Sequence, residues 1–220
     1  MRRILLTGIT IVSLFIYFPV LCFVEEIIIE GNNLVPSEEI IKTSEINGKI
    51  LAFHNKNVTI NKIMEIKLIK NIRIEQVSFN KIKLLVNEKD IIMSANIGGS
   101  LGHIDENSKF IKNISEYLIK NYPILTIESE SQIKKGVLLL KLLNKEKVLI
   151  SDNISEILIN KIMGATIFTN DGLEIYLGKE EFKKKIKNLA IILKNGKDKN
   201  MKESFIDISN LNKGVVNYNL

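Results

Sequence analysis

The chain has 220 residues, a formal net charge of +6 and a single cysteine, Cys22. Its hydrophobic content of 45% is ordinary for a folded protein and argues against wholesale disorder. Residues 25–220 contain no cysteine, which excludes disulfides and cysteine-coordinated metals there. The excess of lysine is spread through an isoleucine- and asparagine-rich sequence without clustered arginines, so composition does not indicate a nucleic-acid partner.

The first segment of the chain is apolar. Residues 4–24 follow Arg2 and Arg3 and carry no charge, and they are long enough for a helix of roughly 30 Å, the thickness of a bilayer core. The positive-inside rule then keeps residues 1–3 in the cytoplasm and residues 25–220 outside the cytoplasmic membrane. A cleaved signal peptide is the alternative, but no pair of small residues precedes Glu25 to form a cleavage site.

The next part of the sequence, residues 25–90, predicts a small domain in the order strand, helix, helix, strand, strand. Stretches rich in β-branched residues predict the strands, and apolar residues at near-helical spacing predict the helices. The expected elements are a strand over 24–30, a helix from Pro36, a helix over 58–69, a strand from Asn71 and a strand over 81–88.

Residues 91–220 predict a larger mixed α/β domain with a mainly antiparallel sheet, which makes the whole chain an α+β protein. Asn170-Asp171-Gly172 predicts a hairpin. Glu180 and Glu181 are expected in the first turn of a helix that Gly196 ends. The expected strands are 91–95, 101–105, 122–129, 154–159, 165–169, 173–177, 205–208 and 215–218, and the expected helices are 133–145 and 179–195.

Motifs for catalysis or cofactor binding are weak. Gly98-Gly99-Ser100-Leu101-Gly102 matches the serine-hydrolase pattern, but a strand-like segment follows it where a helix is required. His54 and His103 are the only histidines, and neither has a ligand partner at helical spacing. Phosphate-loop and dinucleotide motifs are absent from the sequence. We therefore expect no catalytic, cofactor or metal site.

Several segments together resemble a known family. Residues 24–32 and 34–40 are similar to the start of a POTRA domain, and residues 72–77 and 82–88 are similar to its closing hairpin, although Phe79-Asn80-Lys81 replaces the proline common in that turn. The segments 102–105, 154–157, 172–179, 182–186 and 205–208 then follow in the order typical of the FtsQ/DivIB bacterial cell-division proteins. The resemblance implies a membrane helix over 4–24, a POTRA domain over 25–90 and an FtsQ-type β domain over 91–220.

The resemblance also implies a function. It implies a non-catalytic scaffold at the division septum that recruits single-pass proteins of the FtsB/DivIC and FtsL type, without a cofactor or small-molecule substrate. Because a last strand often lies at a sheet edge, we expect partner strands to pair there. The residues assigned to this edge are Phe205, Asp207, Val215, Val216 and Tyr218.

Three alternatives accompany that reading. The five edge residues could serve only to close the sheet. The chain could instead be a membrane-anchored envelope enzyme or receptor of another class, which would require a pocket with convergent polar groups. A secretion-type POTRA transporter is disfavoured, because no strand series long enough for a membrane barrel follows residue 90.

Overall fold

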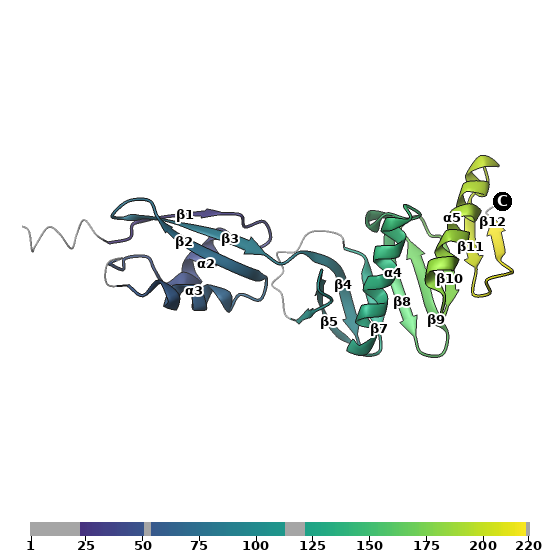
Figure 1. Ribbon diagram of the computed structural model, residues 1–220, viewed down its shortest axis with the longest axis horizontal. Helices are drawn as coiled ribbons and strands as arrows, with labels where there is room; N and C mark the ends of the chain where they lie inside the picture. The colour runs from purple at the N-terminus through teal and green to yellow at the C-terminus, as the bar shows by residue number, and fades with distance from the viewer. Residues whose placement is uncertain (1–22, 51–53, 113–121, 219–220) are drawn as a thin grey trace, which may run out of the picture. The chain divides into compact units, whose positions relative to one another are not determined.

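The computed structural model describes residues 23–50, 54–112 and 122–218 (Figure 1). These residues form two compact units, and the chain passes from the first to the second between Lys89 and Asp90. The predicted membrane-spanning segment lies outside the described residues except for Phe23 and Val24. Within the described ranges, no helix has the length and apolar character needed to cross a bilayer.

The first unit has the predicted order of strand, helix, helix, strand, strand. Its three-stranded sheet has the order β1-β3-β2, with β1 parallel and β2 antiparallel to β3. Apolar residues from both helices and from alternate positions of β3 are fully buried, among them Ile40, Ile63, Ile82 and Leu84. The elements are β1 (Glu26–Glu30), α2 (Ser37–Ser44), α3 (Lys56–Met64), β2 (Ile69–Gln76) and β3 (Lys81–Glu88).

A buried carboxylate fixes the loop between β1 and α2. Glu88, at the end of β3, is only 9% exposed and accepts backbone N–H groups from Asn33, Leu34 and Val35 at 3.1, 2.8 and 2.9 Å. Hydrogen bonds from several donors compensate the loss of water around a buried charge. Glu88 therefore holds the loop that precedes α2 against the C-terminal end of β3.

The second unit is built on a nine-stranded sheet of order β12-β11-β10-β9-β8-β7-β4-β5-β6. Of the eight pairings between described strands, five are antiparallel, and three, β4–β7, β7–β8 and β10–β11, are parallel. The elements are β4 (Ile91–Ile97), β5 (Ser100–Asp105), β6 (Phe110–Lys112), β7 (Ile124–Ile127), α4 (Ile133–Lys145), β8 (Ile154–Asn160), β9 (Gly164–Thr169), β10 (Glu174–Gly178), α5 (Phe182–Asp198), β11 (Glu203–Asp207) and β12 (Val215–Tyr218).

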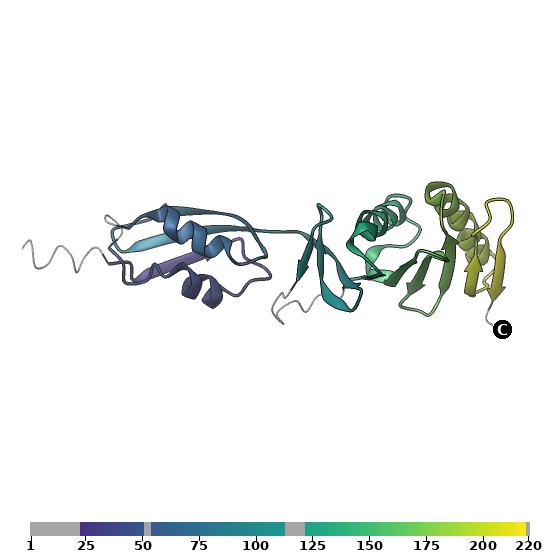
Figure 2. The ribbon, with the colours of Figure 1, turned by 90° about the horizontal axis from the view of Figure 1, so that it is seen from below.

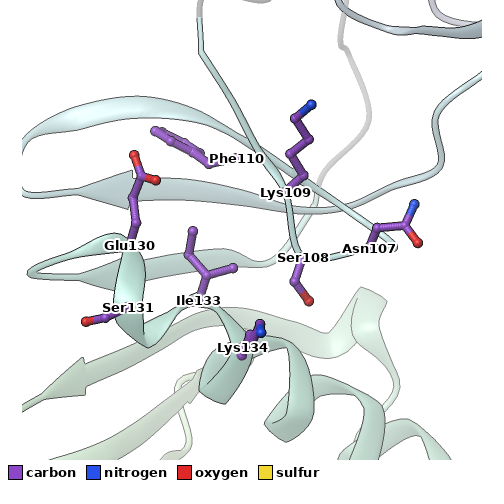
Figure 3. A pocket seen from close by; sticks show the side chains of 8 residues that line it. All are labelled: Asn107, Ser108, Lys109, Phe110, Glu130, Ser131, Ile133 and Lys134. Atoms are coloured by element: carbon purple, nitrogen blue, oxygen red, sulfur yellow. The ribbon is translucent and has the colours of Figure 1, made fainter.

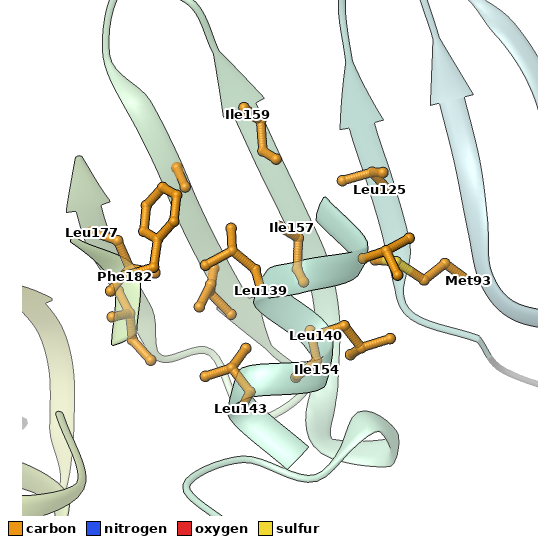
Figure 4. Close-up of a cluster of buried hydrophobic side chains, with 14 of the residues drawn as sticks. Met93, Leu125, Leu139, Leu140, Leu143, Ile154, Ile157, Ile159, Leu177 and Phe182 are labelled. Carbon is orange, nitrogen blue, oxygen red and sulfur yellow. The ribbon is translucent and has the colours of Figure 1, made fainter. Parts of the chain in front are cut away.

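Helices α4 and α5 lie on the same face of this sheet (Figure 1, Figure 2). Alternate residues of the strands point toward them, as in β8, where Ile157 and Ile159 are buried and Leu158 is only partly buried. One apolar core between the helices and this face includes Leu139, Ile157 and Phe182 (Figure 4). The opposite face keeps partly exposed alternate residues, as in β4, β8 and β9.

Two helices have bounds that differ from those expected, and one strand was missed. The helix expected over 58–69 is α3, which begins at Lys56 and ends at Met64, because Ile69 is already paired with Glu88 in the β2–β3 ladder. The helix expected over 179–195 begins at Phe182 and continues to Asp198. Strand β6 was not expected at all; it is three residues long and pairs only with β5 among the described strands.

The displacement of α5 has two local causes. Gly178 has φ +69° at the end of β10 and Glu181 has φ +57° before the helix, so the two glutamates form the turn into the helix and not its first turn. Gly196 does not end the helix. It lies inside the last turns, where a Cβ atom would collide with the carboxyl group of Glu203, so its missing side chain makes room for β11.

Neighbouring leucines of α4 provide a direct test of this core. Leu139 is fully buried, whereas Leu138 is 50% exposed on the outer side of the same helix. We expect Leu139→Ala to lower the free energy of unfolding by about 2–5 kcal/mol, because it removes buried methyl groups and leaves a cavity. The matched control Leu138→Ala should change it by no more than about 0.5 kcal/mol. Denaturant unfolding of both variants measures this, and equal losses would contradict the packing of α4.

Candidate partner-binding edge

Strand β12 forms one edge of the nine-stranded sheet (Figure 1, Figure 2). It is antiparallel to β11, with Val216 opposite Ile206 and Val215 opposite Asp207. A bulge lies between Glu203 and Phe205 on the β11 side. Within the described residues, the other long side of β12 has no neighbouring strand.

The five residues predicted from the sequence meet at this edge but divide between its two faces. Val216 lies opposite the fully buried Ile206 and packs against the core beneath α5. Tyr218 is two residues further along β12 and therefore lies on the same face as Val216. Phe205, Asp207 and Val215 belong to the alternate set on the open face. Val215 is 49% exposed there. The edge therefore presents an apolar side chain on each face of the sheet.

The direction of the backbone groups follows from one side-chain contact. The hydroxyl of Ser204 donates to the carbonyl oxygen of Asn217 at 3.3 Å, so this carbonyl points toward β11. In an antiparallel pair, successive residues direct their N–H and C=O groups to opposite sides of the strand. Val216 and Tyr218 therefore direct their backbone groups toward the unpaired side.

Polar contacts hold the loop between β11 and β12 in place. The Asp207 carboxylate accepts the backbone N–H of Ser209 at 2.8 Å, and the side chain of Asn188 on α5 donates to the carbonyl of Leu211 at 3.2 Å. These bonds attach the loop to α5 and to the end of β11. They fix where β12 begins, and they use the Asp207 carboxylate locally.

A buried lysine lies under this end of the sheet. Lys185 of α5 is 5% exposed, and its ammonium donates to the carbonyl of Leu177 at 2.8 Å. Burial lowers the pKa of Lys185 because the charged form loses hydration, although the nearby carboxylates of Glu181, Glu180 and Asp207 partly oppose this shift. The sequence does not distinguish Lys185 from the exposed Lys183 and Lys184 beside it, and only the positions of the helix and β10 reveal that Lys185 faces inward.

A buried carboxyl oxygen of the partly buried Glu203 belongs to the same region. Oε1 of Glu203, at the start of β11, is buried and has no hydrogen-bond partner among the described residues. This carboxyl occupies the space left by Gly196. Burying a polar oxygen without a partner costs free energy, so the β11 end of the sheet carries a destabilising group that the rest of the core lacks.

No arrangement for catalysis is found in the described part of the chain. The residues of the serine-hydrolase pattern form the β4–β5 hairpin, with Ser100 opening a strand and His103 Nδ1 lying 3.4 Å from Ser94 instead. Groups of three metal-ligating side chains are absent from the described ranges. An open hollow of about 580 Å³ beside the start of α4 contains no histidine or cysteine (Figure 3). It is lined by Asn107, Ser108, Lys109, Phe110, Glu130, Ser131, Ile133 and Lys134.

The pH dependence of stability tests the environment of Lys185. The pKa of Lys185 in the folded chain lies below its value of about 10.4 in the unfolded chain. Between these two pKa values the unfolded chain binds more protons than the folded chain, so the free energy of unfolding must rise as the pH increases through this range. Relative to Lys185→Met, the free energy of unfolding of the unmodified chain should therefore increase toward pH 10.4. The increase should be about 1.4 kcal/mol for each unit by which folding lowers the pKa of Lys185.

The matched control is Lys183→Met, which removes the same charge from an exposed position of the same helix. Urea unfolding at several pH values between 7 and 10.5 gives the comparison. A difference between the unmodified chain and Lys185→Met that stays constant over this range would show that Lys185 is hydrated.

Comparison with known proteins identifies the family to which the second unit is similar. Residues 95–209 match the family described as "Cell division protein FtsQ/DivIB, C-terminal". The chain is also similar to "Cell division protein DivIB" of Clostridium acetobutylicum, with 33% identity over 91 residues. That match covers 40% of this chain and 36% of the relative's length. Members of this family are non-catalytic division proteins. The family match extends over more than half of the sequence, and the chain belongs to the FtsQ/DivIB family of cell-division proteins.

Proposed function

We propose that this protein is a single-pass membrane scaffold of the bacterial division machinery, which recruits partners by accepting a strand at the β12 edge. Membership of the FtsQ/DivIB family supports the division role. The observation that carries the recruitment proposal is the position of β12 at the end of the sheet. The proposed partners are single-pass division proteins of the FtsB/DivIC and FtsL type.

Strand addition suits this edge for three reasons. The backbone N–H and C=O of Val216 are directed away from β11, so they can pair with an incoming strand. Val215 and Val216 provide apolar contacts on the two faces of the sheet. The loop bonds made by Asp207 and Asn188 hold the edge in register before a partner arrives, which reduces the ordering cost of binding.

The membrane part of the proposal is supported by the sequence. Residues 4–24 are uncharged and follow two arginines, a pattern typical of an anchor with its N-terminus in the cytoplasm. In this topology the POTRA domain, residues 25–90, and the FtsQ-type β domain, residues 91–220, both lie outside the cytoplasm. The protein would then act at the division septum on the extracytoplasmic side.

A proline at position 216 tests strand addition. Val216→Pro in the full chain removes the outward N–H and should weaken binding of an FtsB/DivIC-type partner by roughly tenfold or more, the equivalent of one lost hydrogen bond. The matched control Val216→Ala shortens the same side chain but keeps the N–H, and it should retain binding within about threefold. Both variants and the unmodified chain are purified in detergent, and the partner from the same organism is purified separately. The dissociation constant of each for the partner is then measured and compared.

The folded state is checked in parallel, by circular dichroism and thermal unfolding. Because the Val216 N–H is directed away from β11, its loss should leave the β11–β12 ladder intact. A folded Val216→Pro protein that binds its partner as tightly as the unmodified chain would show that β12 is not the binding edge.

A fluorescent fusion of the full chain tests the location. We expect a band at midcell that forms before constriction in growing cells of the source organism. An even signal around the envelope of dividing cells would contradict action at the septum, and it would do so independently of the binding measurements.

A further inference from the structure

The turn between β2 and β3 exposes apolar side chains. Phe79 is 73% exposed and Val77 is 52% exposed. Every other phenylalanine in the described ranges is buried or partly buried. The turn needs no large apolar residue for its own conformation, because turns are favoured by small polar residues. Phe79 and Val77 together give this turn an exposed apolar surface, which is available for contact with something outside this unit.

The same turn lies beside the first described residues of the chain. The carbonyl of Asn80 accepts the backbone N–H groups of Glu25 and Glu26 at 2.9 and 3.2 Å, and its side-chain amide donates to the carboxylate of Glu25 at 3.2 Å. Parallel pairing of Glu26 with Lys81 continues this contact into the sheet. The turn is thus bonded to the residue that directly follows the uncharged segment 4–24.

Little free chain separates that segment from the folded unit. Val24 is 1% exposed, its N–H donates to the carbonyl of Lys49 at 2.9 Å, and its carbonyl accepts the N–H of Gly48 at 2.9 Å. A step between adjacent residues spans about 3.8 Å, so the β2–β3 turn lies within about 10 Å of Val24. The polar layer on each side of a bilayer core is roughly 5–8 Å thick.

The backbone of the turn is also suited to a less polar environment. The N–H groups of Val77 and Ser78 both donate to the carbonyl of Lys81, at 3.0 and 3.1 Å, and the Ser78 hydroxyl donates to the side chain of Asn80 at 3.0 Å. Backbone groups that are bonded within the protein lose less when they leave water. The turn can therefore approach lipid while its apolar side chains supply the favourable contact.

We propose that Phe79, supported by Val77, inserts into the outer interface of the membrane and holds this unit against the lipid surface. The proposal rests on the membrane-spanning role of residues 4–24 given above. Aromatic and apolar side chains at the headgroup level are favoured by burial of apolar area while the adjacent polar groups stay hydrated. The contact makes a second attachment beside the helix and restricts how the unit tilts on the membrane.

The chain contains no tryptophan, so each introduced tryptophan is a single reporter. The test uses the full chain in liposomes whose lipids carry bromine near the headgroup end of the acyl chains, which quenches tryptophan emission on contact. Phe79→Trp is the test variant. Met64→Trp is the matched control, because Met64 is 40% exposed in the same unit at the end of α3. It lies next to the start of β2, roughly 23 Å of strand from the turn.

We expect roughly a twofold or greater loss of emission for Phe79→Trp, with a blue-shifted maximum, and no loss for Met64→Trp. Equal and negligible quenching of the two variants would overturn the insertion of Phe79. The exposed turn would then have to contact another protein instead of lipid. A third variant, Phe15→Trp, reports on segment 4–24 itself in liposomes whose lipids carry bromine near the methyl end of the acyl chains, because residue 15 lies near the middle of that segment. If Phe15→Trp were not quenched, the membrane anchor would be wrong; if it were quenched and Phe79→Trp were not, only the present inference would fail.

Discussion

The packing of α4 and α5 on one face of the nine-stranded sheet determines most of the second unit. Each helix connects two neighbouring parallel strands, α4 between β7 and β8 and α5 between β10 and β11. Such crossovers are almost always right-handed. The two antiparallel pairings through β9 return β10 to the direction of β8, and both crossovers step the same way along the sheet. Handedness alone then requires the two helices to cover the same face.

The same packing bears on how β12 joins the sheet. Both helices cover one face of the sheet, so the strands contribute to the core through the side chains on that face. Strand β12, which is antiparallel to β11, contributes Val216 to this core. Because no element among the described residues continues the sheet beyond β12, its outward backbone groups have no partner there. Recognition by backbone pairing also requires no catalytic or cofactor-binding side chains, in keeping with a family of non-catalytic division proteins.

The sequence was most informative where local signals and burial agreed. Helix α4 has the predicted bounds of 133–145, because its apolar stripe matches one buried face, and Asn170-Asp171-Gly172 forms the predicted β9–β10 hairpin. The β12 edge was also anticipated from the order of strands. By contrast, strand direction depends on which helix crosses over, and local periodicity does not encode this. The bounds of α5 were misplaced because Gly196 signals a helix end locally but here admits the carboxyl of Glu203.

Two ionisable side chains of the second unit, Lys185 and Glu203, have fewer hydrogen-bond partners than its other buried polar groups. The other buried polar side chains of this unit, Asp105 and Thr169, accept or donate hydrogen bonds within tight turns. Lys185 has one carbonyl partner, and Glu203 Oε1 has none within the described residues. Lys185 lies beside β10, and the carboxyl of Glu203 lies at the start of β11 against Gly196 of α5. Within the described residues of this unit, the buried polar atoms with the fewest partners therefore lie beside β10 and β11, whereas the centre of the sheet at β7–β9 rests mainly on apolar contacts.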